Sequence, residues 1–186
     1  MNLSEQQRLQ RIIQLFDRLF LGAENTQLIG GADEPLYTPS LIAEKPHQLF
    51  FRENFVSSAL HEIAHWCIAG KRRRLQQDFG YWYQPDGRTV DEQAKFESME
   101  VKPQALEWIF SNACGQKFTL SADNLNASDD IADDTGFKQA LVKQARQWCE
   151  SQQLPSRGKI FIDALSEEFN TADPYNITYY QHSYLV

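Results

Sequence analysis

The strongest chemical signal in the sequence is the run HEIAH at residues 61–65, which has the form H-E-x-x-H. The surrounding residues predict a helix from about residue 54 to 70, and histidines four apart on a helix lie one turn apart on the same face. Two neutral imidazoles in that arrangement suit zinc, iron, copper or nickel. Half of the four histidines of the chain fall in this window, so we favour a metal site over two ordinary polar or core histidines.

Two imidazoles seldom complete a protein metal site, so a third ligand to join His61 and His65 is expected elsewhere in the chain. His47 and His182 are candidates. However, His47 precedes the helix in a predicted strand and His182 lies in the C-terminal tail. A carboxylate from the next predicted helix is therefore the better source.

Two glutamates of that helix, Glu97 and Glu100, lie three residues apart and share a face. We favour Glu100 as the third ligand, because apolar residues frame it and a proline follows one turn later. The alternative is that both glutamates face solvent or pair with nearby lysines. The residues that frame Glu100 are Phe96, Met99 and Val101, the proline is Pro103, and the lysines are Lys95 and Lys102.

A set of two histidines and one carboxylate fits two kinds of catalysis. Zinc with a bound water gives a hydrolase in which Glu62 acts as the general base. Ferrous iron with open coordination positions gives an oxygenase. A third alternative is a non-catalytic binding protein whose metal is structural. The spacing of the ligands does not separate these alternatives.

The elements that must position these side chains are mainly helices. The sequence predicts an α+β fold with a single domain over residues 1–186, mostly helical, with a small sheet packed beside the H-E-x-x-H helix. Capping boxes at Ser4 and Thr89 begin two of the helices, Gly22 is expected to end the first, and Pro103 is expected to kink or interrupt the second. The other expected elements are short strands within 25–53, a strand over 79–83 and an acidic connection over 123–134. Helices around 137–148 and 160–169 and a tyrosine-rich tail that folds back are expected to follow.

Composition excludes several classes of protein. The net charge of −7 over 186 residues counts against binding to a nucleic-acid backbone. No apolar run approaches the about 18 residues of a membrane span, and the N-terminal residues lack a secretory signal. The three cysteines are an odd number without paired spacing, which favours a reducing cytoplasm over a disulfide framework.

Longer blocks of sequence surround the motif: HEIAHWCIAG at 61–70, DFGYWYQPDGR at 78–88 and FESMEVKPQALEW at 96–108. These blocks closely resemble the bacterial elongation factor P hydroxylase family. The segments GADEPLY at 31–37 and DNL at 123–125 extend the resemblance over about residues 25–125. One departure is Ala64, where the family has a serine, but this position has no ligand role.

The resemblance implies an enzyme that uses iron(II) and molecular oxygen to hydroxylate elongation factor P on a lysine that already carries a β-lysyl group. It places the metal ligands on His61, His65 and Glu100, and it favours iron over zinc. Glu62 is then expected to orient a ligand or to move a proton. The implied fold is not the double-stranded β-helix of many iron oxygenases. The expected partner is elongation factor P in the cytoplasm, with no direct nucleic-acid or membrane contact.

Overall fold

A computed structural model describes residues 3–42, 44–78, 88–121 and 134–185. Most of these residues are helical, and the strands form one small sheet, so the predicted α+β class with more helix than strand is confirmed. The elements are α1 (Glu5–Glu24), β1 (Thr26–Ala32), β2 (Leu36–Thr38), β3 (His47–Arg52), α2 (Val56–Ile68), the 3₁₀ turn η1 (Arg73–Leu75), α3 (Val90–Cys114), α4 (Thr135–Ser151), α5 (Ser156–Phe169), and two further 3₁₀ turns, η3 (Ile177–Tyr179) and η4 (His182–Tyr184).

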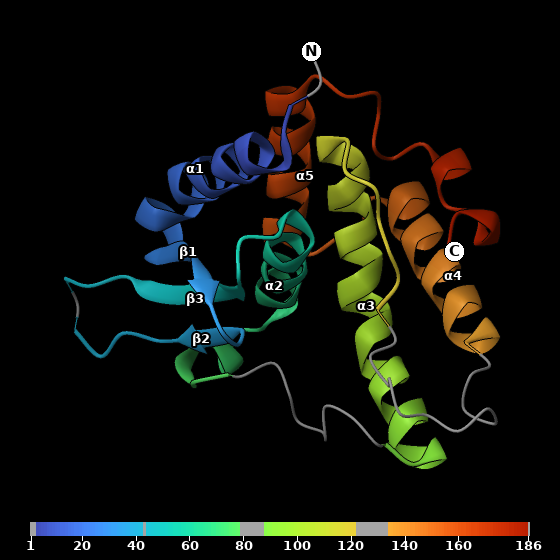
Figure 1. Ribbon diagram of the computed structural model, residues 1–186, viewed down its shortest axis with the longest axis horizontal. Coiled ribbons are helices and arrows are strands. Elements are labelled where there is room, and N and C mark those ends of the chain that lie inside the picture. Colours follow the sequence, from blue (N-terminus) through green and yellow to red (C-terminus); the bar gives the residue numbers. More distant parts are fainter. Residues whose placement is uncertain (1–2, 43, 79–87, 122–133, 186) are drawn as a thin grey trace.

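The helix that carries the H-E-x-x-H motif lies in the middle of the molecule. Figure 1 shows α2 between the sheet and the long helix α3, with α4 on the far side of α3. Helix α2 packs against β3, α3 and α5, while α1 packs against β1. The motif therefore lies on a helix that is held from several sides.

The sheet has the strand order β1-β3-β2, with β3 parallel to β1 and antiparallel to β2. Leu49 and Phe51 of the central strand β3 are buried, as is Leu28 of β1. Alternate residues of a strand point to the same face, so Leu49 and Phe51 share one face of β3, the strand that packs against α2. The sheet thus fixes one side of the motif helix.

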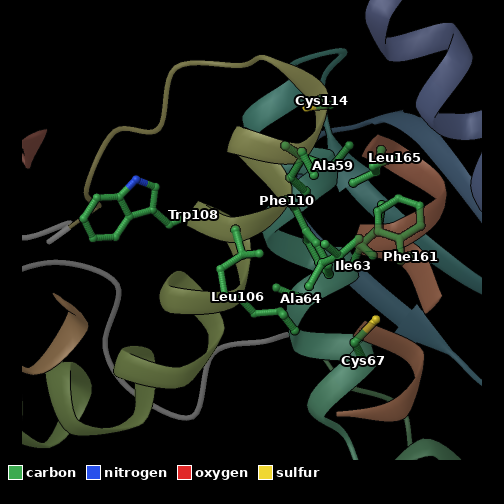
Figure 2. Close-up of a cluster of buried hydrophobic side chains, with 14 of the residues drawn as sticks. Ala59, Ile63, Ala64, Cys67, Leu106, Trp108, Phe110, Cys114, Phe161 and Leu165 are labelled. Carbon is green, nitrogen blue, oxygen red and sulfur yellow. The ribbon is translucent and has the colours of Figure 1, made fainter. Parts of the chain in front are cut away.

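On the side away from the sheet, α2 is held by a cluster of apolar side chains from α2, α3 and α5. Figure 2 shows Ile63 and Ala64 of α2 near Leu106 of α3 and Phe161 of α5. All four side chains are completely buried. Cys67 is also buried in this cluster, as a core residue and not as a metal ligand. Packing on this face leaves the other face of α2 for polar side chains.

Helix α1 begins as predicted but ends later. The Ser4 side chain accepts a hydrogen bond from the Gln7 backbone amide, and the Gln7 side chain accepts one from the Ser4 backbone amide, which confirms the capping box. The prediction that Gly22 ends the helix is wrong, since α1 continues to Glu24. It ends at Asn25, which takes the left-handed conformation with φ 48°, and asparagine tolerates that region better than most residues.

Helix α3 begins with the predicted capping box between Thr89 and Glu92. Of the two predicted effects of Pro103, a kink or an interruption, the interruption does not occur: the helix continues past Pro103 to Cys114, and Gly115 then adopts φ 67°. One missing backbone donor costs less than the burial that this long helix gains, because nearly every residue from Pro103 to Cys114 is buried.

The C-terminal third contains the two predicted helices. Within α5, Phe161 is fully buried, whereas Ile160 is 50% exposed, because it lies on the solvent face of the helix. The tail folds back onto the body of the protein. Tyr180 is completely buried, and its ring centroid lies 5.1 Å from that of Trp108. The predicted strand over 79–83 and most of the acidic connection at 123–134 lie outside the described residues.

Candidate metal centre

Helices α2 and α3 bring the three predicted ligands together. His61 and His65 extend from one face of α2 toward α3, and their Nε2 atoms are 3.1 Å apart. The carboxylate of Glu100 on α3 lies opposite, with Oε2 3.7 Å from His61 Nε2 and Oε1 3.3 Å from His65 Nε2. One donor atom from each residue lies within 4.8 Å of the others. Of the carboxylates considered from the sequence, Glu100 is the one in this cluster.

A fourth residue, Glu107, supports the centre and was missed by the sequence reasoning. Its Oε2 lies 2.8 Å from Nδ1 of His61. When Nδ1–H donates to Glu107, the lone pair of His61 Nε2 faces His65 and Glu100. Glu107 follows Glu100 by seven residues, which is two helical turns on the same face. That spacing is the signal from which Glu107 could have been predicted.

A buried amide holds Glu100 from the other side. Gln104, one turn after Glu100, directs Nε2 toward Glu100 Oε2 at 3.4 Å and donates to the Ser121 carbonyl at 2.7 Å. Its Oε1 accepts the Ser121 amide at 3.1 Å. Residues 100, 104 and 107 therefore form a buried polar stripe along α3, and this stripe faces the histidines of α2.

Burial and neighbouring charges shift the protonation of the cluster. Burial alone would lower the pKa of His61, but the hydrogen bond and charge of Glu107, with Glu100 and Glu62, raise the pKa to about 10. Burial alone would raise the pKa of Glu100, but His65 and His61 lower it to about 2. Burial raises the pKa of Glu107, against the effect of His61. Positive charge is therefore favoured between these carboxylates.

Glu62 lies on a neighbouring face of α2 and borders a cavity of about 30 Å³ beside the metal centre. Only 8% of its surface is exposed, and burial raises the pKa of its carboxyl group, although His61 and His65 lower it. His65 is shared between the cluster and this cavity. The remaining lining residues are Tyr37, Leu49, Trp66, Ala69, Arg73, Arg74 and Asp78.

Comparison with known proteins identifies relatives of this chain. The sequence profile of the family described as "Elongation factor P hydroxylase" matches residues 15–180. A protein of Haemophilus influenzae named "Elongation factor P lysine hydroxylase" is 45% identical over 170 residues, which cover 91% of this chain and 94% of the relative. The chain belongs to the elongation factor P hydroxylase family. The name of the relative gives both a reaction, hydroxylation of lysine, and a protein substrate.

In this member of the elongation factor P hydroxylase family, the other candidate ligands lie outside the cluster. His47 Nδ1 accepts the Ser40 amide at 2.8 Å, and Glu97 accepts the side chain of Gln93 at 3.0 Å. His182 begins η4 near the C-terminus. Within the described parts of the chain, the one group found that could hold a metal is formed by His61, His65 and Glu100.

The donor set of this hydroxylase-family protein fits a divalent ion. Two imidazole nitrogens and a carboxylate converge from two helices that packing holds in place. Glu107 hydrogen-bonds the outer nitrogen of His61, as carboxylates do in many metal sites. The Nε2 atoms of His61 and His65 are 3.1 Å apart, and the Glu100 carboxylate lies beside both. This arrangement favours a positive charge between the three groups, which a metal ion would supply. No helix among the described residues is long and apolar enough to cross a membrane.

Proposed function

We propose that this protein is a non-haem iron(II)-dependent monooxygenase that hydroxylates the β-lysyl-modified lysine of elongation factor P. Molecular oxygen is the co-substrate. The observation that carries the proposal is the convergence of His61, His65 and Glu100 in a chain of the elongation factor P hydroxylase family. The preference for iron over zinc rests on the family resemblance, because these ligands suit either metal.

In the proposed enzyme, His61, His65 and Glu100 hold the iron. When bound, iron(II) supplies the activation of oxygen that hydroxylation requires. Glu107 positions His61 by accepting its Nδ1–H, which keeps Nε2 available for the metal. Glu62 is the proposed catalytic residue, since its carboxylate borders the cavity where a substrate group can reach it and exchange a proton or a hydrogen bond.

The reaction balances with an external reductant. One atom of O₂ enters a C–H bond of the substrate, and the other leaves as water after taking up two electrons and two protons. The electrons come from a two-electron donor that is not part of this chain. We propose that residues 1–186 act as one hydroxylase domain in the cytoplasm, with elongation factor P as partner and without contact to nucleic acid or membrane.

The proposal is tested with iron-loaded protein, a reductant and β-lysylated elongation factor P. Mass spectrometry should show the gain of one oxygen atom on the modified lysine, and isotopically labelled O₂ should supply that atom. His61→Ala and Glu100→Ala should remain folded and lose this activity. Glu97→Ala is the matched control: it removes a carboxylate from the same helix but not from the cluster, and it should retain activity.

The alternative is a zinc-dependent hydrolase in which Glu62 activates water. It predicts cleavage of a peptide bond without oxygen, and full activity in the zinc-loaded protein. Absence of any mass gain with iron-loaded protein would reject the hydroxylase proposal. Equal activity with zinc under anaerobic conditions would favour the hydrolase.

A further inference from the structure

The cavity beside the metal centre contains a buried carboxylate that lacks a partner. Glu62 is only 8% exposed. Within the described part of the chain its side chain makes no hydrogen bond and no ion pair, and its electrostatic interactions are with the histidines and glutamates of the metal centre. Its oxygen atoms are not fully enclosed, so they are accessible from the cavity that Glu62 lines. A carboxylate in so confined a site is stabilised by a cation or by several donors. The structure of the free protein therefore leaves one charge in this cavity to be matched.

The other charged residues that line the cavity already have partners. Arg73 pairs with Asp78 through its Nε atom, and Arg74 pairs with Glu24 at 2.7 Å. Arg157 also approaches Glu24 but does not line the cavity. The two lining arginines thus have carboxylates of their own, and the charges that act most on Glu62 come from the metal-centre residues.

A bound divalent ion would not neutralise Glu62. Glu100 and Glu107 already place two negative charges around the histidines, and these match the charge of the ion while the imidazoles are neutral. Glu62 then remains as an additional buried negative charge. A ligand with one positive group, seated in the cavity, would complete the balance.

The cavity has room for a small cationic group. Its volume of about 30 Å³ exceeds the roughly 10–15 Å³ that a site needs to hold one water molecule. A primary ammonium group fits such a space. Cation–π binding at Trp66 is not the source of affinity, because Arg157 lies 4.6 Å and Arg74 lies 5.8 Å from its ring centroid.

We propose that this cavity binds a primary ammonium group of the substrate side chain and that the Glu62 carboxylate is its specificity-determining partner. The proposal rests on the proposed function for the identity of the substrate, which is the lysine of elongation factor P that carries a β-lysyl group. Because His65 borders both the cavity and the metal centre, an ammonium held by Glu62 places the neighbouring carbons of the side chain next to the metal ligands.

The first experiment tests the chemistry of the cavity without elongation factor P. Zinc-loaded protein is titrated with n-butylamine at neutral pH, with n-butanol as the uncharged probe of similar size, and NMR resonances of Trp66 and Ala69 are followed. The amine should shift them and the alcohol should not. Glu62→Gln should abolish the shifts while still binding one equivalent of zinc. Glu150→Gln, which removes an exposed carboxylate on α4, should keep them. Equal shifts in Glu62→Gln, or no shifts in the wild type, would overturn the proposal.

The second experiment compares binding of β-lysylated elongation factor P to zinc-loaded wild type and to zinc-loaded Glu62→Gln. Wild type should bind more tightly by on the order of 10- to 100-fold, the range for one charge-assisted hydrogen bond. Glu150→Gln should bind like the wild type. If Glu62→Gln binds as tightly as the wild type and the wild type hydroxylates, the inference is wrong and the proposed function stands. If the amine response depends on Glu62 but the wild type hydroxylates nothing, the ammonium site stands and the proposed function fails.

Discussion

Two of the three proposed metal ligands, His61 on α2 and Glu100 on α3, are oriented by a neighbouring side chain. Glu107 fixes His61 through Nδ1, and Gln104 connects Glu100 to the backbone of Ser121. Such outer contacts restrict the rotamers of the ligands, so less conformational entropy is lost when a metal binds. The precision of the centre therefore depends on more residues than the three ligands.

Replacement of Glu107 should weaken metal binding. Glu107→Ala removes the acceptor of the His61 Nδ1–H and leaves that group buried, so we expect a loss of about 10- to 100-fold in zinc affinity. Glu107→Gln keeps an acceptor oxygen and should lose less. A competition titration against a chromophoric chelator measures both values. Glu97→Gln serves as the control on the same helix, and an Ala variant that binds zinc as tightly as this control would contradict the role of Glu107.

The sequence predicted the three residues that converge at the candidate metal centre, but it did not predict the side chains that support them. His61 and His65 are visible because their spacing alone places them on one face, and Glu100 is visible because apolar residues frame it. Glu107 required knowledge of which face of α3 meets α2, and a single helix does not carry that information. Glu62 is part of the sequence motif, but the sequence does not show that its side chain lacks a partner. That property depends on the residues of the sheet and of η1 that line the same cavity.

The motif helix is held at its C-terminal end by a residue distant in sequence. Arg157 of α5 directs Nη2 at the carbonyl oxygens of Trp66, Cys67 and Ala69, at 2.8, 3.2 and 2.7 Å. Carbonyl groups at a helix C-terminus lack intrahelical donors, and a cation there also interacts favourably with the helix dipole. Arg157 thus links the end of α2, just after His65, to α5.

Removal of this link should destabilise the protein. Arg157→Ala leaves buried carbonyl oxygens without their charged donor, so we expect the free energy of unfolding to fall by about 2–4 kcal/mol. Urea denaturation followed by circular dichroism measures the change. Arg18→Ala removes an exposed arginine that pairs with Glu168 and should cost less than about 1 kcal/mol. Similar losses in the two variants would show that the contacts to α2 contribute little.

Helix ends were predicted less well than helices, and Gly22 illustrates the reason. A glycine often ends a helix, but here the chain has a better stop three residues later, at Asn25 with φ 48°. The last residue of α1 is determined by the point at which the chain must turn into β1. The local sequence does not specify that point. Gly22 consequently occupies an ordinary position inside α1.

An alanine at position 22 should therefore stabilise the protein. A Cβ atom there would meet no heavy atom within 4 Å, and alanine loses less backbone entropy on folding, so we expect a gain of about 0.5–1 kcal/mol. The shift in the urea midpoint measures it. Gly31, at φ 80° in β1, provides the opposite case, because Gly31→Ala should destabilise. A loss of stability in Gly22→Ala would indicate that the helix end needs the glycine.

At the scale of the whole molecule, the apolar core does not depend on the metal centre. Buried side chains from all five helices and from the sheet form one cluster, including Phe16, Phe51, Phe110 and Phe161. The two proposed metal ligands on α2, His61 and His65, lie on the opposite face of the helix from Ile63. Hydrophobic burial of this extent supplies most of the folding free energy without a bound ion. This separation argues against a purely structural metal.

Metal removal should accordingly lower stability without unfolding the chain. A ligand that binds only the folded state adds about 4 kcal/mol when present at about 1,000 times its dissociation constant, which corresponds to about 10 °C in the melting temperature of a domain of this size. We therefore expect wild type with excess zinc to melt about 10 °C above the same protein in chelator, with a cooperative transition in both. His61→Ala should melt near the chelated wild type and show no response to zinc. Loss of the cooperative transition in chelator, or an unfolded His61→Ala, would instead assign the metal a structural role, because only then would the two-helix centre be needed to hold the core together.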